Sequence, residues 1–305
     1  MTRLLRLPDE FPPELSEPPQ RARWCCAQLE EGNVLFFAKL PFAMPSEEIQ
    51  FLLGQQQSGA GYHKNIAYRP AQDRLTGHAE RDAARVAMLR AALRGYSQRA
   101  TRFTSELLAP YAESLRVDFT SFRPQREEVR QARVRARNDL MHFDSFPTRP
   151  TDGHRILRIF SNINPREARV WNTSETFDTL AERYAGSAAL PLPKKLAWPH
   201  SVFLKLVRRL GLGSLARSPY DRWMLRFHHF LKEQEEFQRT AVRGRWEFPP
   251  MSTWLVFTDM VSHAVVSGQY ALEQTFIVSK DSLVVPEKSP LRLLEHLAGC
   301  ELTLN

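Results

Sequence analysis

Two parts of the chain carry short hydrophobic runs with the spacing of β-strands. In residues 115–123, apolar and polar side chains alternate with the two-residue period of a strand. Similar stretches follow in two groups: 139–146, 154–164 and 168–172, then 252–259, 262–266, 269–278 and 282–285. Pro and Gly punctuate these stretches, and no helix intervenes between neighbours within a group. The pattern predicts a jelly roll (a double-stranded β-helix) and argues against a parallel α/β sheet.

Helical periodicity is strongest before the first group of strands. Apolar side chains recur at helical spacing through residues 79–108, and Pro110 marks the end of that helix. A shorter helix is predicted over 46–54. Residues 33–42 have the character of a strand, whereas the Pro- and Glu-rich residues 1–20 are predicted to form an irregular arm.

The predicted fold class is therefore α+β, in a single domain over residues 1–305, a length that fits one large domain or two smaller ones. Residues 1–114 are expected to form a mixed, largely helical N-terminal support. The jelly-roll core is assigned to 115–172 and 246–290, and 173–245 is expected to be a basic helical insertion.

The composition is that of a globular protein. Hydrophobic residues make up 43% and charged residues 25% of the chain, which excludes a disordered tail, a collagen or a coiled coil. No run approaches the ~18 apolar residues of a membrane span. Pro8, Asp9 and Glu10 interrupt the N-terminus where a secretory signal would be apolar. Cysteine usage, with Cys25 next to Cys26 among three in total, favours a reducing, cytoplasmic environment.

The chain has a net charge of +8, and one segment alone has an excess of positive charge of the same size. Residues 191–245 contain twelve Lys and Arg against four acidic residues, an excess equal to that of the whole chain. Within this segment, Lys205, Arg208 and Arg209 interleave with apolar residues, as in helices that lie on anionic membranes. We expect the segment to face an anionic membrane surface. The alternative is an ordinary surface helix whose apolar stripe packs on the core.

His142 and Asp144 carry the strongest chemical signal. Because they are two residues apart on a predicted strand, both side chains point to one face and can bind the same ion. His263, in the second group of strands, supplies another imidazole. Two His and one carboxylate form the facial triad of non-haem Fe(II) oxygenases, which leaves positions open for cosubstrate and O2. A packed strand histidine and a zinc hydrolase are the alternatives. The adjacent His228 and His229 are expected at the surface.

Such an oxygenase usually draws electrons from 2-oxoglutarate, whose far carboxylate needs a buried cation. Arginine suits this role because its planar guanidinium binds a carboxylate through two parallel hydrogen bonds. Arg158, among apolar residues in the predicted strand 154–164, is the first candidate, with a cross-strand ion pair as the alternative explanation. Arg123 is the second candidate, and Asn162 could add a hydrogen bond to the cosubstrate.

Four stretches of the chain resemble the bacterial Kdo hydroxylases. They are HFDSFPTRPTDGHRILRIFSNINPREARVW, FTDMVSHAVVSGQYALEQTF and, nearer the N-terminus, LEEGNVLFFAKLPFAMPSEEIQFLL and YHKNIAYRP. The first contains His142 and Asp144, the second contains His263, and the resemblance extends from about residue 28 to residue 285. That family comprises Fe(II)/2-oxoglutarate-dependent enzymes of Gram-negative bacteria. They hydroxylate carbon 3 of 3-deoxy-D-manno-oct-2-ulosonic acid (Kdo) in the lipopolysaccharide inner core, which gives Ko.

The resemblance implies that His142, Asp144 and His263 bind iron, with 2-oxoglutarate and O2 as cosubstrates and succinate and CO2 as coproducts. It also implies a Kdo-containing lipid A precursor as substrate, at the cytoplasmic face of the inner membrane, and no nucleic-acid partner. Many members of the wider superfamily place an Arg or Lys further along the strand of the distal His, where this chain has Gln274. This favours Arg158 as the cosubstrate anchor and leaves Gln274 as a polar residue lining the site.

Two other functions stay open at this point. The same oxygenase chemistry could act on another glycan or on a protein, because the triad defines the reaction and not the substrate. Alternatively, a non-catalytic basic jelly-roll module could hold membrane or nucleic acid through residues 191–245. The aromatic residues available to such a module are Trp198, Phe203, Trp223, Phe227 and Phe230.

Overall fold

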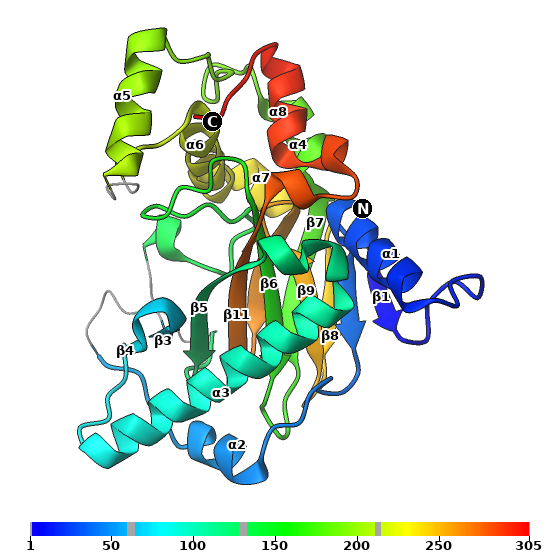
Figure 1. The fold of residues 1–305 in the computed structure, drawn as a ribbon, viewed down its shortest axis with the longest axis vertical. Helices are drawn as coiled ribbons and strands as arrows, with labels where there is room; N and C mark the ends of the chain where they lie inside the picture. Colours follow the sequence, from blue (N-terminus) through cyan, green and yellow to red (C-terminus); the bar gives the residue numbers. More distant parts are fainter. Residues whose placement is uncertain (1, 60–64, 128–132, 211–214, 305) are drawn as a thin grey trace.

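Two β-sheets form the centre of the molecule (Figure 1). The structure is a computed structural model, and it describes residues 2–59, 65–127, 133–210 and 215–304. The large sheet has eight strands in the order β1-β2-β9-β6-β11-β5-β3-β4. Their bounds are β1 Leu4–Leu7, β2 Val34–Phe37, β3 Ile66–Arg69, β4 Arg74–Thr76, β5 Arg116–Arg123, β6 Arg155–Asn162, β9 Thr253–Phe257 and β11 Ala271–Val278. Strands β1 and β2 are parallel, and every other neighbouring pair is antiparallel.

The small sheet has three antiparallel strands in the order β10-β7-β8. These are β7 (Arg169–Thr176), β8 (Gly244–Phe248) and β10 (Val261–Ser267). Aromatic rings join this sheet to the large one. Phe248 stacks on Trp254 with ring centroids 3.9 Å apart, and Trp171 meets Phe160 edge to face at 4.8 Å. The two sheets therefore share one buried layer of aromatic side chains, which forms a hydrophobic core between them.

Helices cover the large sheet and gather at one end of it. Figure 1 shows α3 running across the face of the large sheet, with α4 to α8 together at the end where the chain terminates. Their bounds are α1 Pro18–Glu30, α2 Ser46–Leu53, α3 Ala83–Leu107, α4 Phe177–Tyr184, α5 Trp198–Arg209, α6 Pro219–Glu233, α7 Glu235–Thr240 and α8 Pro290–Ala298. The predicted periodicity of the long helix is confirmed, because Leu89, Leu93 and Tyr96 are fully buried. The predicted combination of helices with a large β-sheet is confirmed as well.

Three local predictions were wrong. The arm of residues 1–20 contains β1, whose alternating burial lets it pair with β2 at the sheet edge. Residues 139–146 form no strand beyond an isolated bridge. Residues 282–285 form none either, because the backbone N–H groups of Val284 and Val285 donate to the buried carboxylate of Glu30 instead of to a neighbouring strand.

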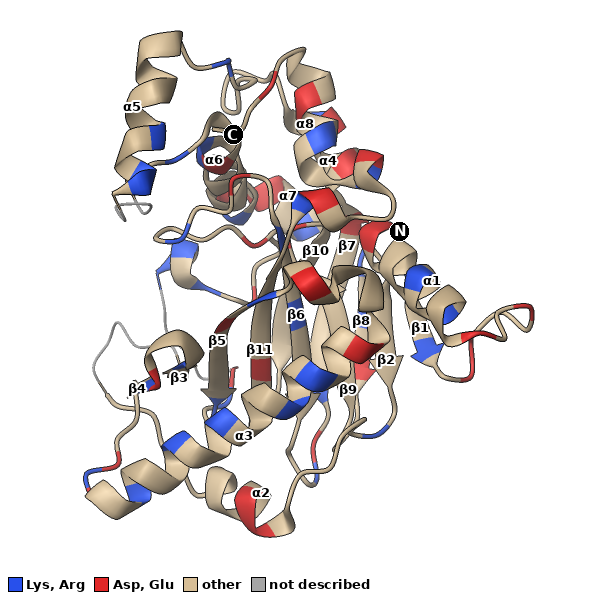
Figure 2. Ribbon diagram, in the orientation of Figure 1, with Lys and Arg blue, Asp and Glu red and all other residues tan. Residues whose placement is uncertain are grey.

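Basic residues are not confined to the segment 191–245. Figure 2 shows Lys and Arg along α3 as well as near the C-terminal end of α5. On α3 these charges are paired with acids from other segments: Arg94 lies 2.5 Å from Asp73, and Arg99 forms an ion pair with Glu48. Pairing of this kind offsets part of the charge of α3, whereas no ion pair is found for Lys205 and Arg209 of α5 among the described residues.

Candidate metal centre and active-site pocket

His142 and His263 are joined through their backbones. The two residues form an isolated antiparallel bridge, in which the His142 N–H donates to the His263 carbonyl at 3.1 Å and the reverse bond measures 3.0 Å. Directly opposed residues of an antiparallel pair present their side chains on the same face. The imidazole centroids are accordingly 4.8 Å apart. A single bridge thus brings the two imidazoles to one face, the role that the sequence assigned to a full strand.

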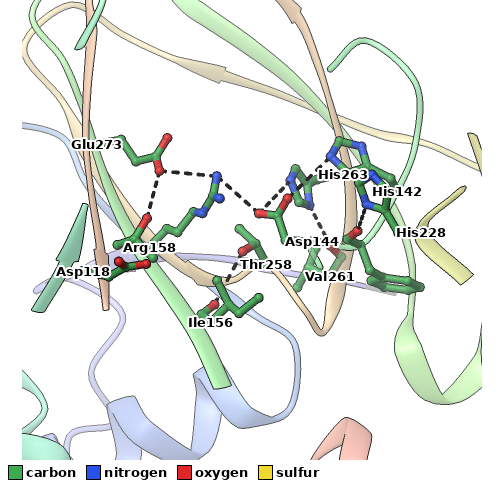
Figure 3. A network of polar contacts seen from close by, with 12 residues as sticks. Asp118, His142, Asp144, Ile156, Arg158, His228, Thr258, Val261, His263 and Glu273 are labelled. Atoms are coloured by element: carbon green, nitrogen blue, oxygen red, sulfur yellow. Dashed lines mark hydrogen bonds and ion pairs between the residues drawn. The ribbon is translucent and has the colours of Figure 1, made fainter. Parts of the chain in front are cut away.

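Asp144 completes a group of three ligands on this face (Figure 3). Its Oδ1 lies 3.7 Å from Nε2 of His142, and its Oδ2 lies 4.0 Å from Nε2 of His263. One ligand atom from each of the three residues falls within 4.8 Å of the others. The separation is close enough for one ion to contact all three at ordinary metal–ligand distances.

The orientation of both imidazoles is fixed by backbone carbonyls. Nδ1 of His142 lies 2.7 Å from the Leu140 carbonyl, and Nδ1 of His263 lies 2.9 Å from the Val261 carbonyl. A carbonyl can only accept, so each Nδ1 carries the proton and donates it. Each Nε2 is therefore left with a lone pair that points toward Asp144, as a metal-binding histidine requires.

The protonation states of the triad also suit a metal. Burial lowers the pKa of His142 below its usual value and that of His263 to about 3, so both rings are neutral near pH 7. Burial alone would raise the pKa of Asp144. The charge of the Arg158 guanidinium opposes this, and the pKa of Asp144 lies well below its usual range. Neutral imidazoles and an ionised carboxylate are the forms that bind a divalent cation.

Arg158 and Arg123 both reach this centre. Arg158, on β6, places Nη1 3.3 Å from Oδ2 of Asp144 and 3.3 Å from Oε1 of Glu273 on the adjacent strand β11 (Figure 3). Arg123 approaches the same Glu273 from β5, at 2.6 Å. The cross-strand ion pair foreseen as the alternative for Arg158 is therefore present. It does not exclude the cosubstrate role, because Nε of Arg158 and Nε of Arg123 are buried without a hydrogen-bond partner in the described part of the chain.

A third arginine was missed in the sequence. Arg169, at the start of β7, is almost fully buried and lines a small cavity of about 30 Å³ together with Arg123, Arg158 and His263. Trp171, two residues further along the same face, stacks on the His263 ring at 5.2 Å and also lines the cavity. The rule that selected Arg158, an arginine among apolar residues on a strand, applies equally to Arg169.

Asn162 and Gln274 are not brought to the centre. The Asn162 amide donates to the carbonyls of Glu167, Phe248 and Pro249 and holds the turn after β6. Gln274 pairs in register with Ile159, on the opposite face of the sheet from Arg158.

Gln274 is fully buried on the α3 side, where its Oε1 accepts from Ser97 and Thr120. The prediction that it lines the site was wrong, because the strand alternation places its neighbours Glu273 and Thr275 there instead.

His228 is also placed differently from the prediction. It is buried rather than at the surface, its Nδ1 lies 2.6 Å from the Phe143 carbonyl, and its ring meets that of His142 edge to face at 5.0 Å. Together with the partly exposed His229 it lines the wall of a larger pocket that opens from the metal centre. That pocket has a volume of about 540 Å³, room for a sugar.

Comparison with known proteins identifies the family. Residues 14–301 match the family model for 3-deoxy-D-manno-oct-2-ulosonic acid (Kdo) hydroxylase. No curated protein matched in a sequence search. Among solved structures, the Kdo hydroxylase KdoO, a non-haem Fe(II) α-ketoglutarate-dependent dioxygenase, matches in its complex with α-ketoglutarate and Fe(III). That match has a TM-score of 0.80 and 34% sequence identity, and it covers 99% of this chain and 97% of the other.

The cobalt(II) complex of KdoO gives the same result. It matches with a TM-score of 0.82 and 35% identity, over 98% of this chain and 97% of the other. The family match, the overall fold and the triad of two imidazoles and one carboxylate agree with one another. This chain belongs to the Kdo hydroxylase family.

Proposed function

We propose that the protein is an Fe(II)/2-oxoglutarate-dependent dioxygenase that hydroxylates carbon 3 of Kdo in a lipid A precursor to give Ko. The observation that carries the proposal is the preorganised triad of His142, Asp144 and His263 beside buried arginines, in a chain of the Kdo hydroxylase family. The same chemistry on another glycan or a protein is not favoured, because the family match extends over nearly the whole chain.

His142, Asp144 and His263 would hold the iron through their Nε2 atoms and a carboxylate oxygen. Three protein ligands on one face leave the opposite face for cosubstrate and oxygen. When bound there, Fe(II) and 2-oxoglutarate supply the oxidising chemistry, with succinate and CO2 as coproducts. The chain's own part is to keep the imidazoles neutral and oriented and the carboxylate ionised.

Arg158, Arg123 and Arg169 would bind the carboxylates of 2-oxoglutarate. All three line the small cavity next to the triad, and Arg123 and Arg158 also line the larger pocket that opens from it. The acids beside these charges are Asp144, Glu273 and Glu127. A carboxylate of 2-oxoglutarate that enters from the larger pocket would accept hydrogen bonds from the buried Nε atoms of Arg123 and Arg158. We keep Arg158 as the principal anchor because it also touches Asp144 and so links cosubstrate to metal.

We interpret the two sheets as the halves of a double-stranded β-helix. The interpretation is supported by the position of the ligands: His263 comes from β10 of the small sheet, while Arg158 and Glu273 come from adjacent strands of the large one. A site enclosed between two facing sheets is typical of jelly-roll proteins.

Anaerobic binding followed by oxygenation tests the proposal. Purified protein should bind Fe(II) and 2-oxoglutarate without oxygen, and admission of O2 should add 16 mass units, roughly one oxygen atom, to a Kdo-containing lipid A. His142→Ala, Asp144→Ala and His263→Ala should each abolish 2-oxoglutarate turnover and leave the fold intact. Near wild-type consumption by His263→Ala would remove this ligand assignment. Consumption of 2-oxoglutarate without hydroxylation of Kdo would support the assignment as an oxygenase but refute Kdo as the substrate.

We further propose that the enzyme meets its substrate at an anionic membrane surface, on the cytoplasmic face of the inner membrane of a Gram-negative bacterium. The support comes from α5, where Trp198, Val202, Leu206 and Leu210 recur every four residues and are strongly exposed. Trp198 is 79% exposed and Phe203, on the same side, is 60% exposed. Apolar side chains exposed in such a continuous ridge mark a surface that is covered in use.

Charge at the edge of this ridge favours an anionic bilayer as the covering surface. Lys205 and Arg209 flank the apolar side chains, and no ion pair to them exists within the described residues. Polybasic attraction contributes about 1 kcal/mol per charge near an anionic leaflet. The opposite side of α5 does pack inward, through Leu204 and Val207. Among the described residues, no helix is long and apolar enough to cross a membrane.

The structure does not favour a nucleic-acid-binding module. Two of the aromatic residues that such a module would use, Trp223 and Phe227, are buried in the core against Phe177. Stacking of bases requires exposed rings.

A further inference from the structure

Two phenylalanine rings lie between three guanidinium groups along the wall of the large pocket. Arg158 lies 5.6 Å from the ring centroid of Phe146, and Arg149 lies 4.1 Å from the same centroid. Arg149 also lies 4.0 Å from the ring centroid of Phe119, which Arg69 approaches to 4.6 Å. A row of cations therefore leads outward from the metal centre, with Arg158 innermost.

The pocket carries more positive charge than its own residues compensate. The cations in its lining are Arg69, Arg74, Arg123, Arg135, Arg149, Arg158 and Lys232. Its acids are Asp144 and Glu273. Asp118 and Glu233, outside the lining, pair with Arg149 and Arg135 and reduce this excess without removing it. Bound Fe(II) and the doubly negative 2-oxoglutarate would cancel each other and add no net charge. The excess favours a further anion in the pocket, beyond the cosubstrate.

Arg149 is the member of the row best placed to hold that anion. It is two-thirds buried, and its partner in the structure is Asp118 on β5. Burial, followed by the charges of Arg158 and Arg69, lowers its pKa to about 10, although it stays protonated near neutral pH. The neighbouring Arg69 has a buried Nε with no hydrogen-bond partner in the part of the chain that the structure describes.

Stacking on a ring also prepares these groups for a carboxylate. A guanidinium held flat on an aromatic face keeps its N–H groups in the plane, where they can donate as a fork to a carboxylate. The rings of Phe119 and Phe146 both contact the guanidinium of Arg149, at nearly equal distances. This limits rotation of the side chain and reduces the entropy lost on binding.

We propose that Arg149, assisted by Arg69, binds the carboxylate of an acidic sugar substrate at a subsite separate from the 2-oxoglutarate arginines. The inference rests on the proposed function, since it concerns how the same pocket selects its substrate. Asp118 holds Arg149 in position and competes weakly with the incoming carboxylate.

Calorimetric binding of the methyl glycoside of Kdo, and of its carboxyl methyl ester, tests the subsite in the full-length protein without turnover. The two ligands differ in one negative charge and contain no phosphate. The wild type should prefer the free acid by about tenfold or more, a difference typical of charge-assisted hydrogen bonds. Arg149→Gln should lose that preference, and Arg149→Lys should keep part of it. The control Arg292→Gln, in an exposed ion pair on α8, should behave as wild type.

Asp118→Asn separates binding from folding. If Arg149 binds the carboxylate, this variant should bind the free acid within about threefold of wild type. Equal losses in Arg149→Gln and Asp118→Asn would show that the ion pair is only structural and would overturn the subsite. A wild type that does not distinguish acid from ester would do the same. The oxygenase function is judged separately, by whether the wild type consumes 2-oxoglutarate with Fe(II) and O2. If it does, failure of the subsite leaves the function standing; if it does not, the function is refuted.

Discussion

Removing the apolar ridge of α5 should release the enzyme from anionic vesicles. The variant we propose is Phe203→Ser with Leu206→Ser, because both side chains point outward and contact no buried cluster. Their loss leaves the inward side chains Leu204 and Val207 in place. The fold should therefore persist while the surface changes.

The size of the effect follows from the exposed fractions of the two side chains. Full burial of a Leu or Phe side chain stabilises by about 1.5–3 kcal/mol. Phe203 is 60% and Leu206 54% exposed, so roughly half of that, about 1–1.5 kcal/mol each, is available for insertion into a membrane. Together they would contribute roughly 2–3 kcal/mol, which corresponds to a drop of about 30- to 150-fold in the partition coefficient.

Co-sedimentation with sucrose-loaded vesicles of about one-third anionic lipid measures this coefficient directly. The matched control replaces exposed apolar residues elsewhere, Met88→Ser with Val242→Ser, which are 54% and 61% exposed. The control should bind as wild type does. Equal binding of the α5 variant and wild type, or an equal loss in the control, would refute membrane insertion by α5.

The charges of α5 should be tested at Lys205 and Arg209 rather than at Arg208. The sequence suggests Arg208 and Arg209 as equivalent membrane contacts, but Arg208 donates to the buried carboxylate of Asp152 at 2.6 Å. Reversal at Arg208 would place two carboxylates together and disturb the fold. Lys205→Glu with Arg209→Glu should weaken vesicle binding, and added salt should reproduce the effect because a Debye length near ~8 Å at 0.15 M screens exposed charges.

Three other outcomes follow from the site and the core. Arg158→Ala should raise the 2-oxoglutarate requirement on the order of hundredfold or more, since loss of a buried charge partner costs about 3–5 kcal/mol, while the sugar requirement changes little; unchanged saturation by 2-oxoglutarate would move the anchor to Arg123 or Arg169. Gly268→Ala should lower the melting temperature and weaken 2-oxoglutarate binding, because at φ +121° an added Cβ would lie 2.9 Å from the Cα of Arg169; calorimetry showing no change would contradict this. Burial raises the pKa of the Cys25 thiol to about 12, so its reactive thiolate is scarce at pH 8, and alkylation of the native protein should label Cys300 before Cys25 or Cys26 in a mass spectrum.

The metal triad was accessible from the sequence because its chemistry is local. Spacing alone placed His142 and Asp144 on one face, and a second imidazole had to come from a later strand. The predicted strand is absent, yet the conclusion survives, because one bridge between His142 and His263 aligns the side chains as a longer ladder would. One correctly paired residue is enough to decide which side chains face the metal.

Roles that depend on register were beyond the sequence. Gln274 faces α3 because it pairs with Ile159, and no feature of either strand taken alone gives that pairing. Asn162 shares a face with Arg158, but it lies four residues along β6, on the order of 13 Å away, where turn carbonyls take its amide. Arg169 could have been found without knowing the register, because it is also an arginine among apolar residues on a predicted strand, although a shorter one.

Asp152 connects α5 to the segment that carries Arg149 of the pocket wall. Its carboxylate binds Arg208 of α5 and the backbone N–H of Leu304, and its own N–H donates to Asp221 on α6. It also stands three residues after Arg149 in the pocket wall. An enzyme bound to a bilayer through α5 would search for its substrate in two dimensions. Its rate would then follow the mole fraction of substrate lipid in the surface, so dilution with inert lipid at constant bulk concentration should slow it.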